Sequence, residues 1–238
     1  MTREEAVRRI ERAAEEKLTQ LDLSGLDLEE LSPEIGKCMQ LETLVFRGCN
    51  QKKGERRKNH RNKFPDAVLQ LTNLKILTLT QWQITEIPEE LGQLSNLTVL
   101  DLGDNQITQI PETFGSLSHL TQLYLNHNQI TQIPETIGQP SNLTHLDLSH
   151  NQIPSIPEAL GQLSNLTRAN FYNNSITQIP EAIELLSFGT QWSDGEDFIQ
   201  QIPPQPLEYQ SNLRRGDFLH PQIMESPEGI SEPSEEEE

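Results

Sequence analysis

An asparagine that recurs at a fixed interval constrains the fold of this chain more than any other feature. Asn105, Asn128, Asn151 and Asn174 are each separated by 23 residues. Ahead of each stands a Leu-x-x-Leu-x-Leu-like block, and behind each stands Ile-x-x-Ile-Pro-Glu. One such unit cannot bury its own apolar face, whereas stacked units share a continuous core. The sequence therefore predicts a solenoid of repeats.

Each part of the unit predicts a local structure. Two leucines separated by one residue are typical of a short strand with one buried face. The asparagine amide both donates and accepts, so at the turn after the strand it can satisfy backbone groups of neighbouring coils. Pro-Glu-x-Ile/Leu-Gly indicates a single helical turn, with Pro early and Gly late. The predicted fold is an α/β solenoid with a curved parallel sheet on its concave face and short helical or 3-10 turns on its convex face.

Seven units can be counted, and their pattern and period resemble those of the leucine-rich repeat proteins. They start near Leu18, Leu41, Leu74, Leu97, Leu120, Leu143 and Leu166. In the first three units, Leu26, Cys49 and Trp82 occupy the asparagine position. Leucine and tryptophan cannot bridge two backbones as an amide does. We therefore expect a regular asparagine ladder only from Asn105 onward.

The beginning of the chain also resembles one bacterial subgroup. The segment TREEAVRRIERAAEEKLTQLDLSGLDLEELSPEIGKCMQLETL is similar to the N-terminal leucine-rich region of cyanobacterial and related bacterial Roco-type proteins, and the resemblance covers roughly residues 1–188. In those proteins the repeats precede a Ras-like GTPase module, but this sequence has no Gly-x-x-x-x-Gly-Lys-Ser/Thr motif. The resemblance implies a stand-alone recognition module. A remnant of a larger Roco-like protein, with a separately encoded GTPase as its partner, is the alternative.

Composition divides the chain into four parts. Residues 1–17 predict an amphipathic helix that caps the first repeat. Residues 18–188 hold the repeats, with a basic insertion at about residues 50–63. Residues 189–220 lose the period and predict an irregular C-terminal cap. Residues 221–238 are acidic, contain Pro and Ser, and predict a disordered tail.

The overall charge disfavours several kinds of partner. The chain carries 18 Lys and Arg against 36 Asp and Glu, a formal net charge of −18. Because an acidic surface repels phosphate backbones, nucleic acid is an unfavourable ligand for most of the molecule. The sequence contains no run of about 20 apolar residues that would cross a membrane and no signal peptide. With two cysteines, it predicts a protein of the reducing cytoplasm without a membrane partner.

The insertion in the second repeat reverses this charge locally. Its basic residues are Lys52, Lys53, Arg56, Arg57, Lys58, Arg61 and Lys63. Such a loop could bind an anionic ligand, an acidic partner or a nucleic acid. It contains no aromatic residue on which a base could stack, so a solvated insertion is the simpler interpretation. Binding through residues 52–63 is the alternative function.

The outward positions of the strands predict the main binding surface. Side chains between the strand leucines point to the concave face. Seven strands at about 4.8 Å give a sheet roughly 30 Å long, enough for a standard protein interface. Val45, Ile76 and Val99 form a small apolar patch toward its N-terminal half. The predicted contact residues are Val99, Asp101, Gln122, Tyr124, His127, His145, Asp147, His150, Arg168, Asn170 and Tyr172.

These residues favour a non-catalytic protein-interaction module, a scaffold or adaptor. Tyrosine and arginine are frequent interface anchors. The Roco resemblance implies a small GTPase or another signalling protein as partner. His127, His145, Asp147 and His150 could in principle bind a metal, but their spacing follows from the repeat. An enzyme would need a water-excluding cavity, which an open sheet does not provide. We expect no catalytic residue, metal or cofactor.

Overall fold

The computed structural model describes residues 3–26, 28, 30–48, 63–177, 180 and 191–193. The chain divides into two units, residues 1–201 and 202–238, and every described residue belongs to the first. Within the described ranges lie one α-helix, six 3-10 helices and eight strands. Among these residues, no helix is long and apolar enough to cross a membrane.

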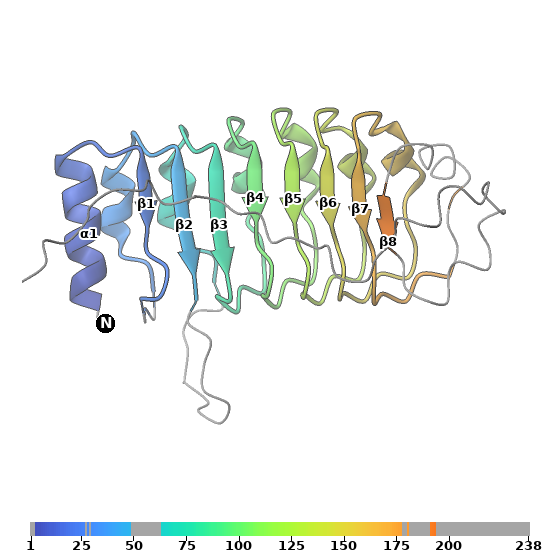
Figure 1. Cartoon of the computed structure of the whole chain (residues 1–238), viewed down its shortest axis with the longest axis horizontal. Coiled ribbons are helices and arrows are strands. Elements are labelled where there is room, and N and C mark those ends of the chain that lie inside the picture. Colours follow the sequence, from blue (N-terminus) through green and yellow to red (C-terminus); the bar gives the residue numbers. More distant parts are fainter. Residues whose placement is uncertain are drawn as a thin grey trace, which may run out of the picture. The chain divides into compact units, whose positions relative to one another are not determined.

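The strands form one parallel sheet in which each strand pairs with the next along the chain (Figure 1). They are β1 (Gln20–Asp22), β2 (Thr43–Arg47), β3 (Ile76–Thr80), β4 (Val99–Asp101), β5 (Gln122–Tyr124), β6 (His145–Asp147), β7 (Arg168–Asn170) and β8 (Gln191–Ser193). The register keeps equivalent positions of the repeats side by side, so that Leu100 pairs with Leu123 and Leu123 with Leu146. The leucine-rich-repeat solenoid predicted from the sequence is confirmed.

The sheet continues one strand further than the sequence predicts. β8 pairs with β7 at the same offset of 23 residues, so that Ala169 pairs with Trp192. The prediction that the repeat period ends at residue 188 is therefore wrong by one strand. The leucine pattern missed β8 because a tryptophan holds the central position, next to an alanine in β7. The other residues of the predicted irregular cap, and the whole predicted tail, lie outside the described residues.

Six short 3-10 helices run along the other side of the solenoid, behind the strands in Figure 1. They are η1 (Pro33–Lys37), η2 (Asp66–Gln70), η3 (Glu89–Gln93), η4 (Glu112–Ser116), η5 (Glu135–Gly138) and η6 (Glu158–Gln162). A proline directly precedes each of η2 to η6, because its fixed φ suits the start of a helical turn. Each turn buries an apolar residue, such as Phe114 or Leu160, against the strand leucines. The core thus lies between the sheet and these turns.

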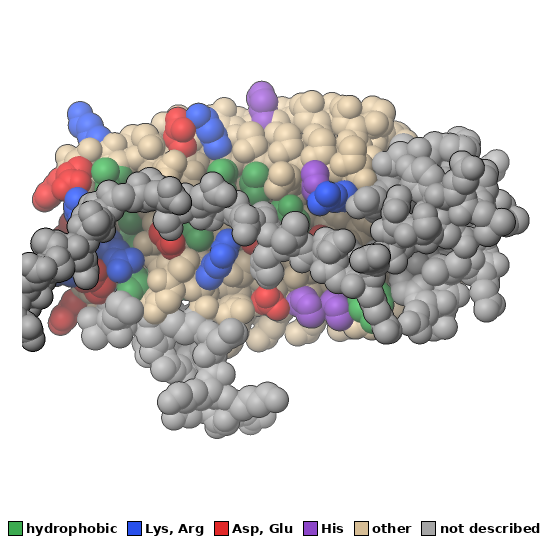
Figure 2. Space-filling view, in the orientation of Figure 1, with side chains coloured by type: hydrophobic (Ala, Val, Ile, Leu, Met, Phe, Trp, Pro, Cys, Tyr) green, Lys and Arg blue, Asp and Glu red, His purple; other side chains and the backbone are tan. Residues whose placement is uncertain are grey.

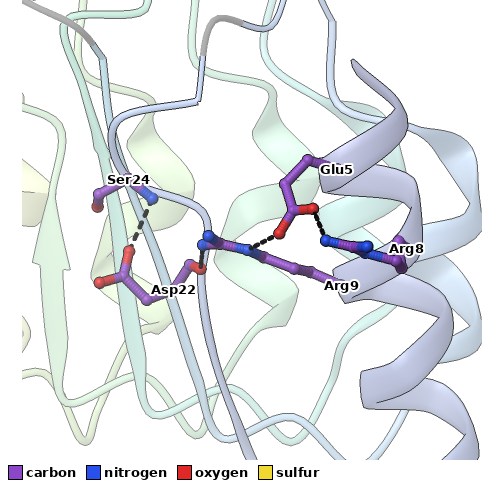
Figure 3. Close-up of polar contacts among 5 residues, drawn as sticks. All are labelled: Glu5, Arg8, Arg9, Asp22 and Ser24. Atoms are coloured by element: carbon purple, nitrogen blue, oxygen red, sulfur yellow. Dashed lines mark hydrogen bonds and ion pairs between the residues drawn. The ribbon is translucent and has the colours of Figure 1, made fainter. Parts of the chain in front are cut away.

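The helix α1 (Arg3–Glu15) packs beside β1 and η1 at the N-terminal end of the solenoid. Its apolar stripe, Ala6, Ile10 and Ala13, is buried. The buried Cys38 thiol donates to the Ile10 carbonyl at 3.5 Å. Arg9 connects the helix to the sheet, because its guanidinium donates to the Asp22 carbonyl at 3.2 Å and to Glu5 at 2.9 Å (Figure 3).

The predicted asparagine ladder is present. The Asn128 side-chain oxygen accepts the backbone N–H of Ile107 at 2.9 Å. Its amide nitrogen donates to the carbonyls of Leu102 and Leu125, both at 3.0 Å. One side chain thus satisfies backbone groups of two neighbouring coils. Asn105, Asn151 and Asn174 repeat this arrangement along the solenoid.

The ladder begins at Asn105, as predicted. At the equivalent position one coil earlier, Trp82 is buried and its ring lies edge-on to Phe46, with the ring centroids 4.5 Å apart. The Trp82 side chain therefore fills the core instead of bridging backbones, and its own backbone N–H is accepted by Asn105 at 3.0 Å. Leu26, in the first repeat, is likewise buried. Cys49 lies outside the described residues.

Two further polar ladders were not foreseen. Thr98, Thr121, Thr144 and Thr167 each donate a hydroxyl to the carbonyl of the equivalent residue one coil earlier, at 2.8–3.0 Å. Asn96, Asn142 and Asn165 each donate an amide N–H to a carbonyl of the preceding coil, at 2.7–2.9 Å. The signal for both is recurrence at the 23-residue period. These residues therefore hold the coils together.

Candidate functional site

The structure places the predicted contact residues along the C-terminal half of the concave face, the sheet face opposite the 3-10 helices. Two rows are aligned by the strand register from β4 to β7, one with Val99, Gln122, His145 and Arg168 and the other with Asp101, Tyr124, Asp147 and Asn170. His127 and His150 lie three residues after the ends of β5 and β6, and Tyr172 lies two residues after the end of β7. All of the predicted residues are described. Their role as contacts stays a prediction.

The residues differ in how much side chain they expose. Arg168 and His127 are exposed, and Tyr172 has 46% of its surface accessible. Tyr124 is half-buried, whereas Asp101 is only 6% exposed. In the small apolar patch, Val45 is buried, while Ile76 and Val99 are half-buried. The polar residues around Tyr124 and Arg168 are therefore the more accessible part of the face.

The acidic and amide residues of the second row have a structural role that sequence analysis missed. The Asp147 Oδ1 atom accepts the backbone N–H of Ser149 at 2.9 Å and its hydroxyl at 2.6 Å. Asp101 accepts the N–H of Gly103 at 3.1 Å in the same way. Asn170 makes the equivalent contact with Tyr172, also at 3.1 Å. These side chains fix the turn after each strand, as side-chain oxygens of Asx turns do.

The same contact recurs in the first repeat, where Asp22 accepts the N–H of Ser24 at 2.7 Å (Figure 3). The outward position between the strand leucines therefore selects Asp or Asn partly for the turn that follows. A variant that removes Asp147 would disturb both the surface and its backbone.

Tyr124 lies between the two carboxylates of its row. Its hydroxyl donates to the Gln122 side-chain oxygen at 3.1 Å. Burial raises the pKa of the Tyr124 phenol, and the charges of Asp101 and Asp147 raise it further. The phenol is thus protonated at neutral pH and offers a fixed aromatic surface with one polar end, which suits protein interfaces.

A stack of aromatic rings borders the face at the C-terminal ends of the strands. The imidazoles of His127 and His150 are 4.0 Å apart and nearly parallel, and Tyr172 meets His150 edge-on at 5.3 Å. Figure 2 shows a pair of adjoining histidines at this edge. Both histidines have φ values in the left-handed region, 53° and 55°. The side-chain amide nitrogen of Asn173, one coil further, lies 2.8 Å from His150 Nδ1.

The histidines predict a loss of stability in acid. Burial lowers the pKa of His150, and so does the neighbouring His127; the pKa of His145 is lowered by burial and by Arg168. Both histidines have a lower pKa in the folded state than the unfolded value of about 6.5. The stability that their neutral forms contribute is therefore complete above that pH and is lost as the pH falls below it.

We therefore expect the urea concentration at the midpoint of unfolding to decrease when the pH is lowered from about 7.5 to about 5.5. The double variant His145→Gln/His150→Gln should show a smaller decrease. His119→Gln serves as the control, because this histidine is exposed. An equal loss in the double variant and in the wild type would contradict the assignment.

Most of the predicted anion-binding loop lies outside the described residues. Of its basic residues, Lys63 is described and exposed, whereas Lys52, Lys53, Arg56, Arg57, Lys58 and Arg61 lie outside the described residues. Binding through this loop stays a prediction. In the part of the chain that the structure describes, no group of three or more His, Cys, Asp or Glu side chains is arranged to hold a metal ion.

The chain is similar to known leucine-rich repeat proteins in both sequence and structure. Residues 54–167 match the family model described as a leucine-rich repeat region. A leucine-rich repeat protein of Leptospira interrogans superposes with a TM-score of 0.57 at 25% identity, over 81% of this chain and 54% of that one. Comparison with curated proteins finds no significant match.

Two further structures share the fold. The ectodomain of the plant receptor kinase GASSHO1/SCHENGEN3 from Arabidopsis thaliana, solved in complex with CASPARIAN STRIP INTEGRITY FACTOR 2, gives a TM-score of 0.62 at 28% identity, over 76% of this chain and 22% of that one. An internalin of Listeria monocytogenes superposes with a TM-score of 0.58 at 23% identity, over 76% of this chain and 51% of that one. This chain thus spans about half or less of the length of these proteins. Residues 54–167 are thus similar in sequence to a leucine-rich repeat region, and the described residues share the solenoid fold of these proteins.

Proposed function

We propose that this chain is a non-catalytic module that binds a protein partner on the concave face, through the surface around Tyr124 and Arg168. The observation that carries the proposal is the alignment of two rows of outward side chains over β4 to β7. This alignment gathers a half-buried tyrosine and an exposed arginine, the side chains most enriched among interface anchors, on one rigid surface.

The fold and one comparison support this function. Leucine-rich repeats are in general protein-interaction modules, and the Arabidopsis ectodomain was solved in complex with CASPARIAN STRIP INTEGRITY FACTOR 2. Residues on strands are held more precisely than residues on loops, so little conformational entropy is lost when a partner binds. A scaffold or adaptor role in signalling, with a small GTPase as one candidate partner, is part of the proposal. It derives from the Roco resemblance of the first repeats.

Affinity capture tests the proposal. We expect the wild-type chain to retain a partner from lysate, and the double variant Tyr124→Ala/Arg168→Gln to lose it by about tenfold or more, because hot-spot residues contribute about 2 kcal/mol each. Asp147 is left intact, since its removal would disturb the turn at Ser149.

The matched control is Gln106→Ala/Gln129→Ala, which changes two exposed side chains that follow the asparagine ladder and lie off the concave face. Equal thermal unfolding of all three proteins shows that the fold is intact. A partner lost with the control and kept by the Tyr124/Arg168 variant would contradict the proposed surface. Loss of binding after deletion of residues 52–63 alone would transfer the function to the basic loop.

A further inference from the structure

Arg168 is an isolated positive charge on an acidic protein. It is the only Lys or Arg between Ile76 and Leu213, in a chain of net charge −18. It lies on β7 at the C-terminal end of its row and is exposed. Among the residues that the structure describes, no Asp or Glu forms an ion pair with it. Figure 2 shows a basic side chain beside a histidine over β6 and β7.

The nearby carboxylate of Asp147 is occupied by other groups. Its Oδ1 atom accepts the backbone N–H and the hydroxyl of Ser149, at 2.9 and 2.6 Å. Its Oδ2 atom accepts the Asn170 amide N–H at 3.2 Å. Both oxygens are thus already hydrogen-bonded within the face. The N–H donors of the Arg168 guanidinium are therefore available to a partner.

His145, the register neighbour of Arg168, uses its Nδ1 atom in a hydrogen bond within its own coil. The Thr144 hydroxyl donates its proton to the Thr121 carbonyl at 2.8 Å. In its 2.8 Å contact with His145 Nδ1, the same hydroxyl oxygen must therefore accept, so Nδ1 carries the proton. Burial and the charge of Arg168 lower the pKa of His145. Both effects favour the neutral imidazole while Arg168 is unpaired.

We propose that Arg168, with His145 beside it, receives a carboxylate of the protein partner, either an Asp or Glu side chain or a C-terminal carboxylate. The planar guanidinium matches a carboxylate with two parallel hydrogen bonds. A polyanion such as a nucleic acid is repelled by the rest of the chain, whereas a single carboxylate meets one complementary charge at short range. This inference rests on the proposed function and adds the chemistry of the partner.

A carboxylate on Arg168 would also change the protonation of His145. It would cancel the positive charge that lowers the His145 pKa, so binding takes up a proton and the affinity rises as the pH falls. Among the described residues, the charged or titratable groups near His145 on the same face of the sheet are Tyr124 on β5, Asp147 on β6 and Arg168 on β7. A partner carboxylate has an ordinary pKa of about 3.3–4.3, so it stays ionised between about pH 7.5 and pH 5.5.

Selection from short random peptides tests the inference with the full chain. One pool carries Asp and Glu with an amidated C-terminus, a second carries no internal acid but a free C-terminus, and a third has no carboxylate. We expect enrichment from the first or second pool, which identifies the source of the carboxylate. Selected peptides should bind Arg168→Gln about tenfold or more weakly, as loss of a charge-assisted pair predicts, and Gln129→Ala as tightly as the wild type.

The pH dependence gives a second measurement. Affinity for a selected peptide should rise a few-fold from about pH 7.5 to pH 5.5, and His145→Gln should remove this rise. Selection from the third pool alone, no selection from any pool, or equal binding by Arg168→Gln would overturn the inference. If the selected peptides lack a carboxylate but need Tyr124 for binding, the carboxylate inference is overturned and the proposed function stands. If the selected peptides need neither Tyr124 nor Arg168, the inference and the proposed function are both contradicted.

Discussion

Replacing Asn128 by alanine is expected to lower the free energy of unfolding by about 3 kcal/mol or more. The Asn128 side chain accepts the N–H of Ile107 and donates to the carbonyls of Leu102 and Leu125. Alanine would leave the buried Ile107 N–H unpaired, which costs about 1–3 kcal/mol. It would also remove one hydrogen bond, at about 1 kcal/mol, from each of the two carbonyls, which keep their bonds to Asn105 and Asn151. Neighbouring coils depend on each other in a solenoid, so the loss should reach the whole array.

Urea unfolding followed by circular dichroism measures this loss. The matched control is Asn142→Ala, which removes a single hydrogen bond to the Ser118 carbonyl from an exposed asparagine. We expect about 1 kcal/mol or less for this control. Equal losses for the two variants would show that the buried ladder does not contribute more than the exposed one.

Gly138→Ala is expected to destabilise the solenoid by about 1–3 kcal/mol. An added Cβ atom would lie 2.2 Å from the Ala159 carbonyl oxygen and 2.8 Å from its carbonyl carbon, both in the backbone of the next coil. A backbone contact this short cannot be relieved by a change of rotamer. The distance between η5 and η6 would have to increase, which would loosen the stacking of the turns.

Gly36→Ala provides the comparison, since this glycine also follows an isoleucine in a 3-10 helix. Its added Cβ atom would meet the side-chain oxygen of Gln70 at 2.6 Å, and Gln70 is exposed and can move away. We expect a change in the thermal midpoint close to zero, because alanine also reduces the entropy of the unfolded chain. A larger loss for Gly36→Ala than for Gly138→Ala would refute the packing argument.

The repeat period made most of the fold predictable. Leucines at alternate positions and asparagine at a fixed offset determine which side chains lie inside, so the sheet, its register and the start of the ladder at Asn105 follow from the sequence. The same rule failed at β8, where Trp192 holds the position of the strand leucine. A change of residue at one position conceals the repeat, although the backbone continues it.

The surface was predictable only in part. Alternation along the strands correctly places Tyr124 and Arg168 on the concave face. It does not show that the carboxylate of Asp147 is used by Ser149 and Asn170, because such contacts depend on the turn geometry after each strand. The stack of His127 on His150 likewise follows from their shared left-handed φ, which the residue type does not reveal.

Site-specific photocrosslinking tests the central claim, binding of a protein partner on the concave face, most directly. A benzophenone amino acid is placed at Tyr124, which is half-buried on the concave face, and separately at Gln129, which is exposed off that face. The account predicts a discrete protein crosslinked from position 124 after irradiation in lysate, and little or none of it from position 129. A partner crosslinked from position 129 and absent from position 124 would contradict it.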